Sequence, residues 1–318
     1  MRRLQEDSKT ARRSAGAVPA PPITPSPYHP NTLALIDLAL AEDIGGGDIT
    51  STVTVAAGQQ ARGKLLAKAA GVISGLDVAG EVFRRVDPAI TFTSLVADGD
   101  VVEAMTPIAT VEGPARSLLA GERVALNLLQ RLSGVATLTA RYVDAVRNTK
   151  ARIVDTRKTT PGLRALEKAA VRHGGGHNHR FGLSDGVLIK DNHLAAIGGE
   201  DRVTRAVCLA RQGAPHTLRI EVEVTTLDEL AQALEAGADV VLLDNMDVAD
   251  ARKAVALTDG RALVEASGGV TLESVAEIAA TGVDLISVGS LTHSAPALDI
   301  SLDLDLSGIS PGTAATRP

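Results

Sequence analysis

The sequence predicts an α/β protein with a small α+β domain followed by a larger domain built on a parallel sheet. Beyond Lys150, apolar strand-like runs alternate with helical segments and recur roughly every two dozen residues. This alternation is typical of parallel strands joined by crossover helices. Before it, short β-branched runs between Thr50 and about Val111 are separated by Gly, Asp and Pro. The alternation alone fits a doubly wound sheet and a (β/α) barrel equally well.

The basic stretch from Asp155 to His193 inside an acidic chain fits a small anionic ligand better than a nucleic acid. The chain of 318 residues has a net charge of -6 and only 2% aromatic residues, which argues against base stacking and phosphate-backbone binding in nucleic acids. No stretch reaches the ~20 apolar residues of a membrane span. We therefore expect neither a nucleic-acid partner nor a membrane. Cys208 is the only cysteine, so a reducing, cytoplasmic location is predicted, and its apolar helical surroundings indicate a core position.

The order of elements suggests where the domains begin and end. Residues 1–30 are rich in Arg, Ser and Pro without an apolar signal segment, and we interpret them as a disordered tail. An N-terminal domain is predicted at 31–133, with "NTLALIDLALAE" as a helix and runs such as "STVTV" and "TPIATVEG" as strands. The catalytic domain is predicted at 134–293, because the long helical stretch from Arg116 to about Arg147 has a break near Ser133-Gly134. The segment 294–318 is expected to pack back on the N-terminal domain.

Chemically capable residues recur where the predicted strands of the second domain end. In βα architectures these carboxyl ends share one face, and ligands bind there. A single such residue is commonly only a helix cap or a turn residue, but six at one face indicate one pocket. The strands "RIVDT", "VLIK", "IEVEV", "VVLLD", "LVEAS" and "LISVG" deliver, in order, Arg157 with Lys158, Lys190, Glu223, Asp244, Ser267 with Gly268 and Gly269, and Gly289 with Ser290.

The two last strand ends indicate a phosphate site. Small residues before a helix leave backbone N–H groups free to face a ligand, and the helix N-terminus adds positive potential. In barrels the loops after the late strands commonly bind phosphate. "EASGGV" and "SVGS" therefore predict a phosphate at the late end of the domain.

The early strand ends are cationic. Arg157, Lys158, Arg180 and Lys190 are expected beside His179, a set that suits a ligand carrying several negative charges. Between these ends, Glu223 and Asp244 can hold ribose hydroxyls, coordinate Mg²⁺ or stabilise a developing positive charge. A zinc site from "HNH" (177–179) is disfavoured, because cations surround it and no cysteine lies near.

Several segments together resemble the quinolinate phosphoribosyltransferase family. The matching stretches are "GERVALNLLQRLSG", "DTRKTTPGLRALEKAAVRHGGGHNHRFGLSDGVLIKDNH", "IEVEV", "LLDN", "EASGG" and "ISVGSLTHSAPALDISLDL", in order, from about Thr32 to Asp305. The resemblance implies a small α/β sandwich domain followed by an incomplete (β/α) barrel with phosphate-binding loops at the strand carboxyl ends. It also implies transfer of phosphoribosyl from 5-phosphoribosyl-1-pyrophosphate to quinolinate with decarboxylation, Mg²⁺ as cofactor, and a homodimer that can assemble further.

The resemblance also assigns residues. Lys158, Lys190, Glu223 and Asp244 are expected to be catalytic, and the two acids to lie at the metal. Arg123 is expected to reach the neighbouring subunit's site. The substrate-binding set that the resemblance implies is Arg123, Thr156, Arg157, Lys158, His179, Arg180, Lys190, Glu223, Asp244, Ser267, Gly268, Gly269, Val288, Gly289 and Ser290.

Three alternatives stay open from the sequence. One is a molybdenum-associated relative of the same fold with another substrate. The second is a barrel lyase that forms a Schiff base through Lys190. The third is a carrier domain, because "DGDVVEAMTPIATVEG" resembles a biotinyl or lipoyl hairpin, although Ala104-Met105 stands where such a carrier has its modified lysine.

Overall fold

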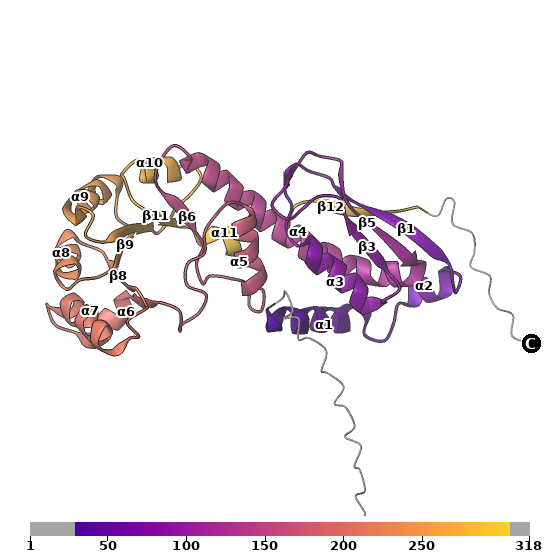
Figure 1. Cartoon of the computed structure of the whole chain (residues 1–318), viewed down its shortest axis with the longest axis horizontal. Helices are drawn as coiled ribbons and strands as arrows, with labels where there is room; N and C mark the ends of the chain where they lie inside the picture. Colours follow the sequence, from indigo (N-terminus) through magenta and orange to yellow (C-terminus); the bar gives the residue numbers. More distant parts are fainter. Residues whose placement is uncertain (1–28, 306–318) are drawn as a thin grey trace, which may run out of the picture.

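The computed structural model describes residues 29–305, which form two lobes side by side (Figure 1). The 32-residue helix α4 (Ala115–Val146) runs from one lobe into the other. The predicted tail, up to residue 28, and the end of the C-terminal segment, 306–318, lie outside the described residues. None of the helices between 29 and 305 combines the length and apolar character that a membrane crossing requires.

The N-terminal lobe is an antiparallel sheet covered by helices. Its strand order is β12-β1-β5-β3, with β2 paired separately to β4. Alternate residues of β1 are buried, as a sheet with one covered face requires. Helices α3 and α4 cover that face. The elements are α1 (Pro30–Ile44), α2 (Ile49–Thr54), β1 (Gln60–Ala67), β2 (Gly71–Val72), α3 (Leu76–Val86), β3 (Thr91–Ser94), β4 (Val101–Val102), β5 (Thr106–Pro114) and β12 (Ile300–Asp305).

The last described strand returns to the first lobe. Strand β12 pairs antiparallel with β1 along its whole length, from Ala67↔Ile300 to Arg62↔Asp305. The chain therefore crosses from the second lobe back to the first after residue 293, and α4 is not the only connection between the lobes.

The interpretation of "STVTV" as a strand is wrong. These residues lie in and just after helix α2, because Asp48 caps the helix by accepting a hydrogen bond from the Ser51 amide at 2.9 Å. Arg116 of α4 then donates to the carbonyls of Thr52 and Val55 and satisfies the end of the helix. Local capping overrides the β-propensity of Val and Thr here.

The predicted helix break at Ser133-Gly134 is also wrong, because α4 continues through both residues. Both are buried, and the Ser133 hydroxyl accepts a hydrogen bond from the Ser74 amide at 3.0 Å. At Gly134 a Cβ atom would overlap the Pro296 carbonyl oxygen. The glycine therefore permits the returning chain to pack against the helix, and it does not end the helix.

The second lobe contains a six-stranded parallel sheet of order β6-β11-β10-β9-β8-β7. Chain neighbours from β7 to β11 are also spatial neighbours, so the sheet winds in one direction as in a barrel and never reverses as in a doubly wound fold. Strands β6 and β7 are the two edges and are not paired to each other, so the barrel is incomplete. The strands are β6 (Arg152–Val154), β7 (Val187–Ile189), β8 (Ile220–Val224), β9 (Val240–Asp244), β10 (Leu263–Ser267) and β11 (Leu285–Ser287).

Helices cover the outside of this sheet (Figure 1). Those that follow β7 to β10 pack against the strands, and α5 packs against α4. Cys208, on α7, is exposed, so its predicted core position is wrong: Val203, Ala206 and Val207 occupy the buried face of that helix. The helices are α5 (Arg164–His173), α6 (Asp191–Ile197), α7 (Arg202–Gly213), α8 (Leu227–Glu235), α9 (Val248–Thr258), α10 (Val275–Ala279) and α11 (Ser290–His293).

A Gly134→Ala substitution should lower the free energy of unfolding by about 1–3 kcal/mol, because the added methyl group overpacks the contact with Pro296. Urea denaturation of the purified chain measures this. Gly213→Ala is the matched control, since it is also helical and a Cβ there meets nothing within 4 Å; its effect should stay within about 0.5 kcal/mol. Equal unfolding midpoints for the two variants would contradict the packing described.

Candidate active site

A cavity of about 310 Å³ opens at the carboxyl ends of the barrel strands. The predicted residues Thr156, Arg157, Lys158, His179, Arg180, Lys190 and Ser267 all line it. Leu188, Leu242, Glu265 and Ser287 complete the lining. Residues from strand ends far apart in the sequence therefore meet in one place, as expected from the shared direction of parallel strands.

The two predicted carboxylates lie on neighbouring strands beside this cavity. Glu223, on β8, is buried and its Oε2 accepts a hydrogen bond from Lys190 Nζ at 3.0 Å. Asp244 ends β9, is half-buried and pairs in register with Ser267 of β10. Neither belongs to a group of three protein ligands spaced for a metal ion among the described residues.

The two glycine loops follow β10 and β11. Gly268 and Gly269 have positive φ angles, and a Cβ at Gly268 would overlap the Asn245 side chain, so only glycine fits this turn. Gly289 lies beside Lys158, whose Cδ would be 3.1 Å from an added Cβ. The amide of Val288 already donates to Val154 O at 3.0 Å and is therefore not free for a ligand. The Ser290 hydroxyl is buried without a hydrogen-bond partner in the described part of the chain.

Arg123 is the predicted site residue that lies apart from this cavity. It is exposed on α4, and its recorded ion pair is with Glu122 at 4.0 Å. Arg131, further along α4, contacts Glu167 and the Thr292 carbonyl, on the carboxyl-end side of the barrel, since Thr292 lies in α11 after β11. Eight residues of helix separate the two arginines by about 12 Å, and Arg123 is on the side of the first lobe.

A buried ion pair positions the cationic loop. Asp155, at the end of β6, and Lys168, on α5, are almost fully buried and in direct contact. Asp155 also accepts hydrogen bonds from the His179 amide at 2.9 Å and from the Asn178 side chain at 2.6 Å. Lys168 donates to the His179 carbonyl at 3.0 Å. The pair therefore holds both backbone groups of His179.

Sequence reasoning did not assign this role to either residue. "DTRKT" draws attention to its cations, and Lys168 reads as one more positive charge in a basic stretch. Burial raises the pKa of Asp155 and lowers that of Lys168, each against the opposing effect of its partner. The hydrogen bonds to His179 and Asn178 satisfy the remaining polar atoms, which such a buried pair requires.

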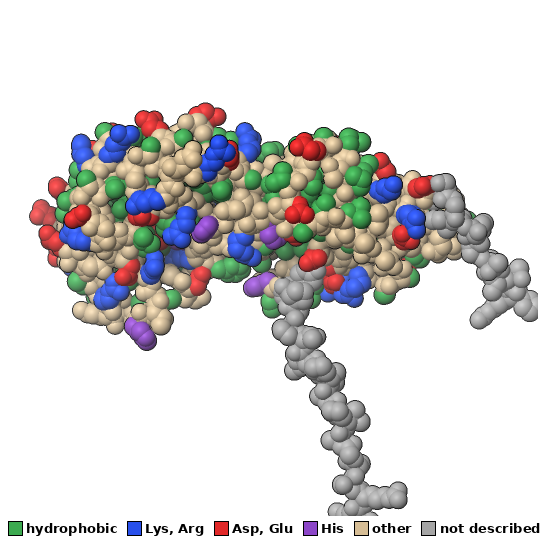
Figure 2. All heavy atoms as spheres, turned by 45° about the horizontal axis from the view of Figure 1, so that its top comes forward, with side chains coloured by type: hydrophobic (Ala, Val, Ile, Leu, Met, Phe, Trp, Pro, Cys, Tyr) green, Lys and Arg blue, Asp and Glu red, His purple; other side chains and the backbone are tan. Residues whose placement is uncertain are grey.

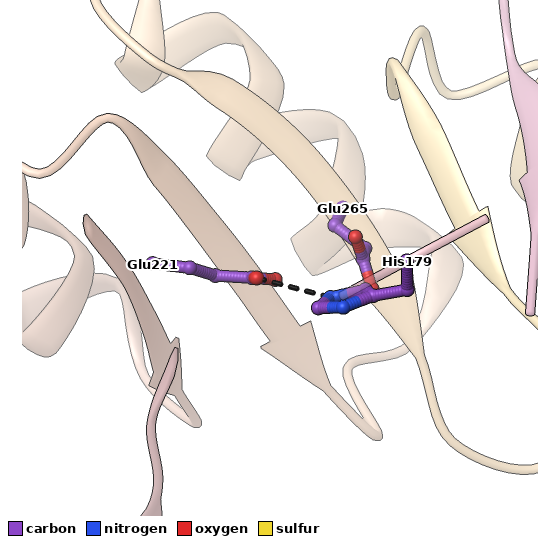
Figure 3. Close-up of side chains that lie close together, drawn as sticks. All are labelled: His179, Glu221 and Glu265. Atoms are coloured by element: carbon purple, nitrogen blue, oxygen red, sulfur yellow. Dashed lines mark ion pairs between the residues drawn. The ribbon is translucent and has the colours of Figure 1, made fainter. Parts of the chain in front are cut away.

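A second cluster lies at the floor of the cavity, inside the barrel. His179 Nε2 is 3.0 Å from Glu221 Oε2 and 3.8 Å from Glu265 Oε1. Figure 3 shows the three side chains close together. Both acids are buried on strands β8 and β10. One oxygen of each, Glu221 Oε1 and Glu265 Oε1, has no hydrogen-bond partner among the described residues.

The contacts of His179 define its tautomer. Nδ1 accepts a hydrogen bond from the Arg180 amide at 2.7 Å, which requires a lone pair on that nitrogen, and Nε2 donates to Glu221. Burial disfavours the charged ring, but the Glu221 and Glu265 carboxylates raise the pKa of His179 overall. The neutral Nε2–H form satisfies both hydrogen bonds.

The sequence contained a signal for these two acids. "IEVEV" has alternating glutamates, so Glu221 and Glu223 must share the face of β8 that points into the barrel. "LVEAS" places Glu265 inside an apolar strand, where an unpaired acid is costly. On strand β8, only Glu223 is assigned a role from the sequence.

The cavity walls are preorganised for anions. The Nε atoms of Arg157 and Arg180 are buried without partners among the described residues. Burial and the neighbouring Arg157 charge lower the pKa of Arg180, so the two guanidinium groups destabilise each other until an anion binds. On the barrel half of the face shown in Figure 2, Lys and Arg side chains and histidines gather close together.

An incomplete (β/α) barrel with convergent cations and glycine loops defines a class of enzyme that binds phosphorylated, polyanionic substrates. Residues 48–133 match the N-terminal domain, and residues 135–303 the C-terminal domain, of quinolinate phosphoribosyl transferase. The chain belongs to this family.

Individual relatives align with this chain over most of their length. A probable nicotinate-nucleotide pyrophosphorylase [carboxylating] of Bacillus subtilis is 46% identical over 279 residues, which are 88% of this chain and 95% of the relative. The Mycobacterium leprae enzyme of that name is 49% identical, over 84% of this chain and 94% of its own. The solved nicotinate-nucleotide pyrophosphorylase of Francisella tularensis superposes with a TM-score of 0.82 at 40% identity, covering 87% and 98% of the two chains.

Replacing Lys168 by Met should lower the free energy of unfolding by about 3–5 kcal/mol, because Asp155 would stay buried without its partner. Chemical denaturation monitored by circular dichroism measures this. Lys150→Met is the control, since Lys150 forms an exposed pair with Asp284 worth about 0–1 kcal/mol. A loss at Lys168 no larger than that at Lys150 would rule out the positioning role.

Proposed function

We propose that this protein transfers the phosphoribosyl group of 5-phosphoribosyl-1-pyrophosphate to quinolinate. The products are nicotinate mononucleotide, pyrophosphate and CO₂. The observation that carries the proposal is the single cavity in which Arg157, Lys158, Arg180 and Lys190 converge at the strand carboxyl ends. Membership of the family supports the same reaction.

The charges of the cavity match these substrates. Quinolinate has two carboxylates and phosphoribosyl pyrophosphate has three phosphate groups, so the pair of ligands offsets the repulsion among the cationic side chains. Arginine forks bind carboxylates and phosphates through two parallel hydrogen bonds. The turn at Gly268 and Gly269 and the loop from Gly289 to Ser290 suit the 5-phosphate, because their backbone can approach a ligand closely.

The donor set fits Mg²⁺ that is held mainly by substrate. Magnesium in such sites takes one or two carboxylates together with substrate phosphates, and Glu223 and Asp244 on neighbouring strands offer two carboxylates. These two residues would hold the ion. When bound, Mg²⁺ neutralises charge on the pyrophosphate leaving group.

The residues of the chain then act mainly by positioning and electrostatics. Lys158 and the arginines neutralise the leaving pyrophosphate as the ribose C1–O bond breaks. Glu223 and Asp244 stabilise the positive charge that develops at C1, and the quinolinate nitrogen attacks that carbon. The positively charged ring nitrogen then withdraws electrons from the adjacent carboxylate, and CO₂ leaves.

We also propose a homodimer in which Arg123 reaches the site of the neighbouring subunit. Its exposed position on α4, away from the cavity of its own chain, supports this assignment. Larger assemblies of such dimers stay a prediction. A cytoplasmic location also stays a prediction, based on the single cysteine.

The alternatives have less support. Lys190 Nζ is already hydrogen-bonded to the Glu223 carboxylate at 3.0 Å, whereas a Schiff base needs a lysine amine free to attack a carbonyl. The carrier-like hairpin has Met105 at its turn, with a positive φ of 66°, and offers no lysine there. The molybdenum-associated relative differs in substrate, so the choice of substrate separates it from the proposal.

Incubation with quinolinate, phosphoribosyl pyrophosphate and Mg²⁺ should release equal amounts of CO₂ and pyrophosphate and form a mononucleotide. Lys158→Ala should lower kcat/KM by about 100-fold or more, because one cation facing the leaving group is lost. Lys253→Ala, an exposed lysine on α9, is the control and should match the wild type. Near-normal turnover by the Lys158 variant would contradict the role of Lys158 at the leaving group. If the wild type formed no product, the proposed transfer reaction itself would be wrong.

Mixing two inactive variants tests the shared site. Arg123→Ala and Lys190→Ala should each be nearly inactive alone. After mixing and subunit exchange, random pairing gives hybrid dimers with one intact site, so about a quarter of wild-type activity should return. Sedimentation confirms the dimer. If the mixture stays as inactive as its components, Arg123 does not act on the partner's site.

A further inference from the structure

The barrel has a second cavity beneath the candidate active site. It has a volume of about 260 Å³ and lies toward the amino ends of the strands. Val240, Leu263 and Leu285 form part of its wall, and the exposed charged residues Arg152, Asp185 and Arg219 line it where it opens. The cavity is large enough for several water molecules, each of which occupies about 30 Å³.

Three residues line both cavities: His179, Arg180 and Glu265. Glu265 is 1% exposed, and its Oε1 has no hydrogen-bond partner among the described residues. This acid therefore stands between the substrate cavity and the amino-end cavity. Glu265 has no role in the proposed transfer of the phosphoribosyl group.

The proposed reaction has a step that lacks a proton donor. When the C2–carboxylate bond of the pyridine ring breaks, CO₂ leaves and the electron pair stays on C2. That carbon must then take a proton to give nicotinate mononucleotide. Without it, the carbanion can recapture CO₂, so the donor determines whether bond cleavage becomes irreversible.

Lys158 neutralises the leaving pyrophosphate in the proposed transfer, and three further neighbours of the cavity are poor candidates for this proton. Both ring nitrogens of His179 are engaged, by the Arg180 amide and by Glu221. A guanidinium group such as that of Arg180 keeps its protons. Lys190 is an ammonium group already bonded to Glu223, and donation would leave that acid unpaired.

We propose that Glu265, in its neutral form, protonates C2 as CO₂ leaves and then recovers a proton from water in the amino-end cavity. The inference rests on the proposed phosphoribosyl transfer and adds a catalytic residue to it. In this step the Glu265 O–H bond breaks and a C2–H bond forms. The carboxylate then takes up a proton from bulk solvent, relayed through water in the amino-end cavity, so that no hydroxide is left in the site.

The electrostatic surroundings support a neutral Glu265. Burial raises the pKa of Glu265 to about 7, and the Glu221 carboxylate adds to the effect, while His179, Ser287 and Lys190 oppose it. These groups face it from β8, the 174–186 loop, β11 and the end of β7. Arg180 lines both cavities with Glu265, and Arg157 and Lys158 line the upper one. An ionised Glu265 would also repel a dicarboxylate ligand, whereas the neutral acid donates a hydrogen bond.

The same cluster is a poor metal site, although its three residues have suitable spacing. A metal ion on His179 Nε2 would displace the hydrogen bond to Glu221, and His179 Nδ1 is taken by the Arg180 amide. Arg180 and Lys190 add positive charge around it. A proton is the cation that this position accommodates.

The test is a Glu265→Gln variant in which pyrophosphate and CO₂ are measured in the same reaction. Pyrophosphate release should stay within a few-fold of the wild type. The ratio of CO₂ to pyrophosphate should fall from one to below about 0.1, since general acids contribute 10²–10⁴-fold, and a mononucleotide that keeps both carboxylates should accumulate. Glu235→Gln, exposed on α8, is the matched control and should keep a ratio of one.

Two results would overturn the inference while leaving phosphoribosyl transfer intact. One is a ratio of one at the wild-type rate in Glu265→Gln. The other is loss of pyrophosphate release in parallel with CO₂, because Glu265 would then act before decarboxylation. Failure of the wild type to release either product would instead remove the proposed function on which the inference rests.

Stability measurements provide a readout that does not depend on turnover. A raised pKa in the folded state gives stability that is present below the unfolded pKa and is lost as pH rises through the folded value. Glu265→Gln lacks this dependence, so its Tm relative to wild type should rise by more than about 2 °C from pH 5.5 to pH 8. A constant difference would mean that Glu265 is ionised throughout and cannot be the donor.

A second variant tests the route by which the proton returns, with Glu265 left intact. Leu263→Phe should fill part of the amino-end cavity. CO₂ should form at the wild-type rate in the first turnover and more slowly in later turnovers. Leu257→Phe, exposed on α9, is the control. A wild-type rate of CO₂ formation in the later turnovers of Leu263→Phe would contradict refilling from this cavity.

Discussion

The buried contact between Asp155 and Lys168 is the interaction on which the site depends. It joins the end of the first barrel strand to helix α5, and through hydrogen bonds to both backbone groups of His179 it fixes the loop on the open side of the barrel. This loop spans the gap between the unpaired edge strands β6 and β7, and among the described residues an isolated β-bridge joins it to the sheet, between His177 and Val154. Charge buried at a cost thus takes the place of a missing ladder of backbone hydrogen bonds.

The arrangement of charge inside the barrel follows from that framework. Cations face the carboxyl-end cavity, and acids on β8 and β10 stand behind them, so Lys190 meets Glu223 and His179 meets Glu221. These contacts offset part of the positive charge and leave the buried Nε atoms of Arg157 and Arg180 free for a ligand. A site that were fully neutralised by its own acids would bind anions weakly, and one with no acids would be costly to fold.

Two elements, helix α4 and strand β12, join the two lobes, so the lobes are not two separate stretches of the chain. Helix α4 contacts strands of both sheets, and β12 returns from the second lobe to complete the first. Gly134 and Ser133 are small because the returning chain and the Ser74 loop press against that helix. The Ser133-Gly134 pair, which resembles a helix break in the sequence, is therefore a site of close packing that becomes visible only in the fold.

The sequence by itself determined the alternation of strands and helices, the strand ends that meet at one face, and the cationic set of Arg157, Lys158, Arg180 and Lys190. These follow from local periodicity and from the direction of parallel strands, which are properties of short segments. Tertiary structure decided three things that local periodicity leaves open: that the sheet winds as an open barrel and not as a doubly wound sheet, that Cys208 faces solvent, and that Asp155 contacts Lys168 while Glu221 contacts His179. Each depends on which surfaces meet across long sequence separations, and neither hydrophobic period nor motif spacing encodes that.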